Sequence, residues 1–187
     1  MNSKGHIIVF SAPSGSGKTT ILQQVFLEFP DAVFSVSATT RKPRPHEVHG
    51  REYFFLSEEE FMQKVAAGEF AEWERFYDYC YGTLRSYIAQ SVENGKTVFL
   101  DLDVKGALSI KSAFPEAALI FIMPPGISTL EERLVKRNTE SDEDLKKRID
   151  RAKMELGYAD RFDHIIVNDE LEPAVLKTIE TVKKITE

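Results

Sequence analysis

The segment Ser14–Thr19, Ser-Gly-Ser-Gly-Lys-Thr, combines residue types that bind a chain of phosphates. It follows the apolar run 6–10, which predicts a buried strand, and it precedes a pattern of helical spacing that starts at Lys18. Glycines let backbone N–H groups turn toward phosphate oxygens, the helix N-terminus adds positive potential, and the lysine reaches the β and γ oxygens. The full pattern has glycine where this chain has Ala12, but strand, loop and helix together predict a P-loop for a nucleoside triphosphate.

Two oxygen donors predict a Mg²⁺ site beside this loop. The Thr19 hydroxyl can ligate the metal, and Asp101 ends a second buried run, where a carboxylate is well placed to hold the metal's water shell. The alternative for Asp101 is a turn residue at the end of a strand.

A second charged group lies in the segment 35–53. Arg41 and Arg44 bracket a Lys-Pro pair, whose stiff backbone sets the two guanidinium groups apart so that both can bind one phosphate. The Tyr53 hydroxyl adds a donor. The alternative is a solvent-exposed basic loop, but prolines stiffen this loop and an aromatic strand follows it, which favours an anion site.

Further along the chain, arginines occur in pairs one helical turn apart. Arg133 pairs in this way with Arg137, and Arg148 with Arg151. On a mobile lid such arginines would neutralise charge on a transferring phosphoryl group and exclude water. The alternative is a set of weak surface ion pairs with neighbouring acids, namely Glu132, Asp144 and Glu155.

Apolar runs that alternate with helical stretches predict a parallel α/β sheet covered on both faces, in a three-layer α/β/α arrangement. The predicted strands are 6–10, 97–103, 118–123 and 164–167. Two stretches break this rhythm. Residues 33–83 predict an inserted mixed α+β lobe, with one short helix capped by Ser57 and Glu60, and residues 126–160 predict a charged helical lid with a break at 138–142. The core of this single domain would then consist of residues 1–32, 84–125 and 161–187.

The composition and charge of the chain exclude several classes of protein. The chain has 187 residues, 42% of them hydrophobic, and a formal net charge of −6. An acidic chain is a poor general binder of nucleic acids or anionic membranes. A single cysteine, Cys80, excludes an intrachain disulfide framework and fits a reducing compartment. No apolar run approaches the roughly 20 residues of a membrane helix, so we expect a cytoplasmic protein, and nothing indicates its oligomeric state.

A GTPase is the first alternative among P-loop proteins, because Asp103–Gly106 matches the short D-x-x-G pattern of a switch segment. No N-K-x-D motif, which would bind the guanine base, occurs in the chain. A match of four residues arises easily by chance, so we reject this alternative.

The chain resembles the guanylate kinases, a family of P-loop nucleoside monophosphate kinases, in a series of motifs that span nearly all of it. In order, these motifs are Ser11–Thr19, Ser37–Arg44, Gly50 with Tyr53, Glu69–Trp73, Tyr81–Thr83, Leu100–Asp103 with Gly106, Arg133 with Arg137, and Ile166–Asp169. The resemblance implies a Mg²⁺-dependent enzyme that transfers the γ-phosphoryl group of ATP to GMP, giving ADP and GDP, in purine nucleotide metabolism and GMP recycling.

The resemblance also implies roles for individual residues. The GMP phosphate would be held by Arg41, Arg44, Tyr53 and Tyr81, and the guanine base by Ser37, Glu72, Thr83 and Asp103. ATP would be held by Ala12, Pro13, Ser14, Gly15, Ser16, Gly17, Lys18, Thr19, Thr20, Arg133, Arg137 and Asn168. The catalytic charges would be those of Lys18, Arg41, Arg137 and Arg148.

The chemistry of guanine supports Glu72 as the residue that recognises the base. Guanine presents N1–H and N2–H₂ donors on one edge, and a carboxylate can accept from both. Adenine lacks this donor pair and would leave buried carboxylate oxygens unpaired, which discriminates strongly between the two bases. The alternative for Glu72 is an exposed acid on a strand.

Two other functions fit parts of the sequence. A guanylate-kinase-like interaction domain would bind phosphorylated peptides without catalysis, but the motif Gly17-Lys18-Thr19 and Asp101 argue for a working P-loop. A related kinase of a sugar phosphate would share the P-loop without needing the residues that recognise guanine.

Overall fold

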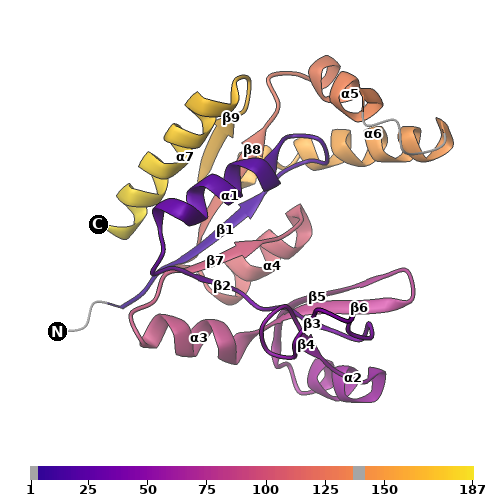
Figure 1. Ribbon diagram of the computed structural model, residues 1–187, viewed down its shortest axis with the longest axis vertical. Coiled ribbons are helices and arrows are strands. Elements are labelled where there is room, and N and C mark those ends of the chain that lie inside the picture. Colours follow the sequence, from indigo (N-terminus) through magenta and orange to yellow (C-terminus); the bar gives the residue numbers. More distant parts are fainter. Residues whose placement is uncertain (1–3, 137–141) are drawn as a thin grey trace.

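The computed structural model describes residues 4–136 and 142–187, and Figure 1 shows their arrangement. In chain order the elements are β1 (Ile7–Ser11), α1 (Lys18–Glu28), β2 (Val33–Phe34), β3 (Ala38–Thr39), β4 (Phe54–Phe55), α2 (Glu58–Ala66), β5 (Phe70–Phe76), β6 (Tyr79–Leu84), α3 (Arg85–Glu93), β7 (Val98–Asp101), α4 (Val104–Ala113), β8 (Ala118–Met123), α5 (Ile127–Lys136), α6 (Asp142–Leu156), a short 3-10 helix (Ala159–Arg161), β9 (His164–Val167) and α7 (Leu171–Thr186).

The core sheet is parallel, as predicted, with the strand order β2-β7-β1-β8-β9. All five residues of β1 are buried, because the central strand has helices against both of its faces. The prediction that residues 33 and 34 belong to the inserted lobe is wrong. They form β2, which pairs with β7 in register Val33 to Val98, so they belong to the core sheet.

Helices cover the two faces of this sheet in separate layers (Figure 1). On one face α1 and α7 pack against alternate strand residues such as Phe10 and Phe99. On the other face α3 and α4 pack against the intervening residues, among them Val9 and Leu100. The structure therefore has the predicted three-layer α/β/α core.

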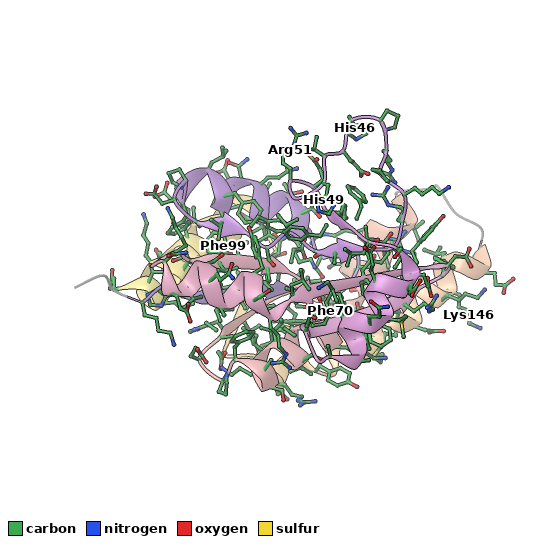
Figure 2. The ribbon with its side chains drawn as sticks, turned by 90° about the horizontal axis from the view of Figure 1, so that it is seen from below. His46, His49, Arg51, Phe70, Phe99 and Lys146 are labelled. Atoms are coloured by element: carbon green, nitrogen blue, oxygen red, sulfur yellow. The ribbon has the colours of Figure 1, made fainter. Side chains whose placement is uncertain are left out.

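A second sheet of four strands, β4-β3-β6-β5, lies beside the core. Its strands β5 and β6 form an antiparallel hairpin. Phe61 of α2 packs against Phe70 and the buried Cys80. Helix α2 starts at the predicted capping box, in which Ser57 and Glu60 exchange hydrogen bonds. Figure 2 shows Phe70 and Phe99 within the packed layers, whereas His46 lies on the loop that projects from one side.

Helices α5 and α6 form the predicted helical segment and share a small apolar contact through Leu130, Leu134 and Ala152. The predicted break at 138–142 falls almost entirely outside the described residues. In Figure 1 both helices and the second sheet lie on the opposite side of the core from the two termini. No helix in the described parts of the chain is long and apolar enough to cross a membrane.

The aromatic cluster between the core sheet and α1 supplies a test of this packing. Phe99 is 1% exposed, and its ring centroid lies 5.4, 5.6 and 5.9 Å from those of Phe10, Phe26 and Phe29. We expect Phe99→Ala to lower the free energy of unfolding by about 3–5 kcal/mol, because it leaves a cavity among these rings. Urea titration measures the change. Leu27→Ala, at a residue that is 76% exposed on α1, is the control and should cost less than about 0.5 kcal/mol.

Candidate active site

The P-loop surrounds one end of a cavity of about 610 Å³. Every loop residue predicted to hold ATP lines it, from Ala12 to Thr20, together with Arg148 of α6 and the tip of the β5–β6 hairpin. Gly15 and Gly17 have φ angles of 89° and 84°, which residues with a side chain rarely adopt. These angles turn the chain from β1 into α1 at the carboxyl edge of the sheet.

Two of the predicted ATP ligands, Asn168 and Arg133, make hydrogen bonds that hold the P-loop and the segment beside it. The Asn168 side chain is buried and its Nδ2 donates to the carbonyl oxygen of Ser16 at 2.7 Å. A Cβ atom on Gly17 would lie 2.4 Å from that nitrogen, so a larger residue there would displace the Asn168 amide from its bond to the loop. Arg133 of α5 donates to the carbonyl oxygens of Asn168 and Asp169 at 3.1 and 3.2 Å. Their direct contact with ATP stays a prediction.

Lys18 and Asp101 meet at the junction of α1 with the end of β7. The ammonium group forms an ion pair with the Asp101 carboxylate and donates to the carbonyl oxygen of Leu102 at 3.2 Å. The predicted phosphate-binding cation and the predicted metal-binding acid therefore lie together. Thr19, one residue further along α1, lines the P-loop cavity, whereas Asp101 lines a different cavity.

A second cavity, of about 290 Å³, lies between the second sheet and the end of β7. It brings together five of the residues predicted to hold GMP, which are Ser37, Tyr53, Glu72, Tyr81 and Asp103. Thr83 does not line it. Its buried hydroxyl lies behind Glu72 and donates to that carboxylate at 2.6 Å.

Glu72 is held in an unusual electrostatic environment. Burial raises the pKa of its carboxyl group above the ordinary value, and the negative charges of Asp103 and Glu74 act in the same direction, while the hydrogen bond from Thr83 opposes them. Hydrogen-bond donors from a ligand would favour the ionised form. A carboxylate in this position suits a base edge that presents N–H groups.

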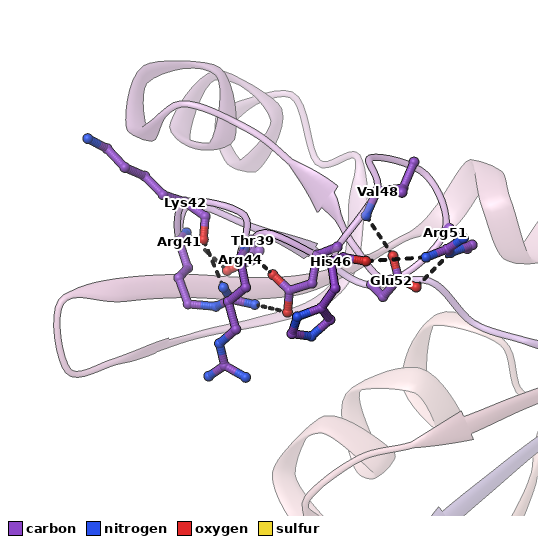
Figure 3. Close-up of polar contacts among 9 residues, drawn as sticks. Thr39, Arg41, Lys42, Arg44, His46, Val48, Arg51 and Glu52 are labelled. Carbon is purple, nitrogen blue, oxygen red and sulfur yellow. Dashed lines mark hydrogen bonds and ion pairs between the residues drawn. The ribbon is translucent and has the colours of Figure 1, made fainter.

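The two arginines of the predicted phosphate site are organised by an acid that the sequence analysis did not identify. Glu47 accepts from the Arg41 guanidinium and from the Arg44 backbone N–H, at 2.8 and 2.7 Å. Figure 3 shows the loop that carries both arginines. Arg41 also lies over the ring of Tyr53, with its Cζ 5.4 Å from the centroid. These contacts argue against a merely solvent-exposed loop, since the Arg41 and Glu47 side chains are 15% and 6% exposed.

The spacing of Arg44 and Glu47 could have indicated this turn, because a side chain three residues on can accept from the earlier backbone N–H. The bond to Arg41 depends on how the loop folds back, which no local pattern encodes. Neither arginine lines the second cavity, although in Figure 3 both side chains extend to the same side of the loop.

Helix α6 carries two arginines toward the cavities. Arg148 donates to the Ser14 hydroxyl of the P-loop at 2.7 Å. Arg151 forms an ion pair with Glu155, as the alternative of surface ion pairs predicts, and it also contacts Asp103. Arg137, the other predicted lid residue with a catalytic role, lies outside the described residues.

The D-x-x-G match at 103–106 has a structural explanation. Asp103 is the N-cap of α4, and its Oδ1 accepts from the backbone N–H of Gly106 at 2.8 Å. The same acid lines both cavities, so one residue caps a helix and faces the space between the two predicted binding sites.

Comparison with known proteins decides the family. The guanylate kinase family model matches residues 4–185. The chain belongs to the guanylate kinase family. It is 46% identical over 180 residues to a guanylate kinase from Thermotoga maritima, covering 96% of this chain and 87% of the relative. A guanylate kinase from Chlorobium luteolum is 49% identical over 172 residues, covering 91% of this chain and 87% of that relative.

The fold comparison agrees with the family. The crystal structure of guanylate kinase from Anaplasma phagocytophilum superimposes with a TM-score of 0.73 at 27% identity, covering 99% of this chain and 88% of that one. The resemblance found in the motifs of the sequence is thus confirmed for the whole length of this guanylate kinase family member.

The Glu47 contacts predict a specific dependence of stability on pH. The hydrogen bonds from Arg41 and then from the Arg44 backbone lower the pKa of Glu47 from 4.5 to about 2 in the folded protein. A carboxyl group with a lowered pKa stabilises the fold above its unfolded pKa, and this contribution is lost as the pH falls toward the folded value. Because glutamine does not titrate, Glu47→Gln should be less stable than the parent chain by a constant amount above about pH 5.

The difference between the two proteins should shrink steadily between about pH 4.5 and pH 2. Urea titrations of both proteins across this range measure it. A difference that does not change with pH would show that the Glu47 carboxylate is not bonded to these arginines.

Proposed function

We propose that this chain is a guanylate kinase that transfers the γ-phosphoryl group of ATP to GMP. The observation that carries the proposal is the adjacency of the two cavities. The P-loop cavity of about 610 Å³ and the second cavity, which is lined by the carboxylates of Glu72 and Asp103, share three lining residues. These residues are Phe76, Asp103 and Arg151. A nucleoside triphosphate in the first and a guanine nucleotide in the second would thus meet at a common boundary, as direct transfer requires.

The proposed mechanism depends on positioning the two nucleotides and on neutralising the charge of their phosphates, and it needs no side chain that acts as a general base. The attacking oxygen of GMP is already anionic, so transfer can proceed in line without a covalent enzyme intermediate. Lys18 would bind the β and γ phosphates, and Arg148, which reaches Ser14 of the P-loop, would neutralise charge on the transferring group. Arg41 and Arg44, with the hydroxyls of Tyr53 and Tyr81, would hold the GMP phosphate.

The oxygen donors beside the P-loop fit Mg²⁺. The metal prefers one or two carboxylates together with phosphate oxygens, and Asp101 and the Thr19 hydroxyl offer this donor set. When bound, Mg²⁺ neutralises charge on the β and γ phosphates. Asp101 is paired with Lys18, so binding of the metal would require the Lys18 ammonium group to move from this carboxylate to the phosphates.

Guanine would be recognised through its donors. Glu72, fixed by Thr83, would accept from N1–H and N2–H₂, with Ser37 and Asp103 completing the contacts. Asn168 and Arg133 would act on ATP largely through the P-loop that they support. Arg137 keeps its proposed lid role.

The arrangement of elements suggests how these parts move. We assign the core to the parallel sheet and its helices, the GMP-binding lobe to the second sheet with α2, and the lid to α5 and α6. The lobe and lid are each held by a small apolar cluster of their own, which suits rigid pieces that close on the core. We also propose a cytoplasmic location and a part in purine nucleotide metabolism, including GMP recycling.

The deciding experiment is a coupled assay for ADP release with ATP and Mg²⁺, in which GMP, AMP, CMP, UMP and ribose bisphosphate are compared as acceptors. We expect turnover with GMP alone. Turnover with ribose bisphosphate would instead indicate a sugar-phosphate kinase. Binding of GMP without any turnover would favour an interaction domain for phosphorylated peptides.

The P-loop assignment predicts the effect of removing its charge. Lys18→Ala should lower kcat at least about a hundredfold, because the ammonium group would no longer stabilise the transferring phosphates. Circular dichroism should show an unchanged fold. Lys177→Ala, at an exposed lysine of α7, is the matched control and should retain full activity. Near-normal kcat in Lys18→Ala would contradict the assignment.

The base-recognition role predicts a selective effect at Glu72. Glu72→Gln should raise KM for GMP about tenfold or more while KM for ATP stays nearly constant, because an amide cannot accept from both guanine donors. Steady-state kinetics with each substrate varied in turn measure both constants. Glu59→Gln, on the exposed surface of α2, is the control, and an equal rise in both constants would refute the role.

A further inference from the structure

Arg151 lies in the third turn of α6, where its guanidinium group joins two acids. Its Nε donates to Glu155 of the same helix at 2.9 Å, and its Nη2 donates to Oδ2 of Asp103 at 3.2 Å. The Glu155 side chain is only 7% exposed, whereas those of Arg151 and Asp103 are 42% and 28% exposed. A buried acid on the lid thus fixes the guanidinium group that contacts the core.

Negative charge predominates around the contact between Arg151 and Asp103. Four carboxylates line the proposed GMP cavity, and they belong to Glu72, Glu74, Asp101 and Asp103. Arg151 is the only basic side chain among the described residues that line it. Since Asp101 is already paired with Lys18, Arg151 supplies the positive charge beside Asp103, the acid that it contacts.

Both oxygens of Asp103 are committed by these contacts. Oδ1 accepts from the Gly106 N–H at 2.8 Å as the cap of α4, and Oδ2 accepts from Arg151. A carboxylate held at both oxygens has a fixed plane, and this one lines the cavity. The neighbouring acids Glu155 and Asp103 also raise the pKa of Arg151, in keeping with a permanent positive charge.

We propose that Arg151 is a positioning residue for GMP binding, which orients the Asp103 carboxylate toward the guanine nucleotide and links that carboxylate to the lid helix α6. This inference rests on the proposed function, because it assumes that the cavity lined by Glu72 and Asp103 takes GMP. Arg151 also lines the P-loop cavity, so the link runs along the boundary between the two sites.

The effect of Arg151 should be confined to one substrate. Arg151→Met keeps the length of the aliphatic stem and removes the charge. We expect it to raise KM for GMP about tenfold, the size of one charge-assisted hydrogen bond, with KM for ATP and kcat changed less than about twofold. Arg151→Lys, which keeps the charge but not the two-pronged geometry, should recover part of the loss.

A double-mutant cycle tests whether Arg151 acts through Asp103. Asp103→Asn keeps an oxygen for the Gly106 N–H and therefore the cap of α4. If Arg151 acts on GMP by orienting Asp103, then adding Arg151→Met to Asp103→Asn should change KM for GMP less than about twofold. A role limited to holding α6 through Glu155 would give the same tenfold loss in both backgrounds and would overturn the proposal.

Two controls keep the outcomes distinct. Lys153→Met removes an ion pair between α6 and Glu131 of α5, away from the cavities, and should leave KM for GMP unchanged. Where a variant turns over too slowly, calorimetric titration with GMP gives the same comparison from Kd. Lack of turnover in the parent chain would refute the proposed function, whereas an active parent with an unchanged GMP constant in Arg151→Met would refute only the role of Arg151.

Discussion

The close approach of the loop after β1 to the chain after β9 is the constraint on which the site depends. Backbone N–H groups can face a phosphate only if the loop turns sharply into α1, and that turn requires positive φ angles at Gly15 and Gly17. The Asn168 amide fills the space that a side chain on Gly17 would need. Parallel pairing of β1, β8 and β9 brings these segments together at one edge of the sheet. The phosphate site is therefore a property of the sheet as much as of its motif.

Opposite charges in this protein are arranged before any ligand binds. Lys18 is paired with Asp101, Arg41 with Glu47, and Arg151 with both Asp103 and Glu155. Each pair holds a side chain in place, and where that side chain has the nucleotide-binding role proposed above, this order lowers the entropic cost of binding. The pairs of Lys18 and Arg151 also place basic groups beside acids at the two cavities of a chain with a net charge of −6.

The sequence predicted helices and strands better than it predicted the tertiary contacts between them. The predicted strands 118–123 and 164–167 match β8 and β9, and the capping box of Ser57 and Glu60 starts α2. These features are local, because periodicity and caps involve residues a few positions apart. The prediction for residues 33 and 34 is wrong because two apolar residues do not indicate which strand they pair with. Their pairing with β7 places them in the core sheet.

By itself the sequence determined the P-loop, the alternation of buried strands with helices, and the ordered motifs that indicate the guanylate kinase family. Each of these depends on residue types at short, fixed spacings. The tertiary structure alone decided that Glu47 organises Arg41, that Asn168 supports the P-loop, and that Arg151 reaches Asp103. The last two contacts join residues that are 152 and 48 positions apart, and such pairs meet only after the sheet and its helices have packed.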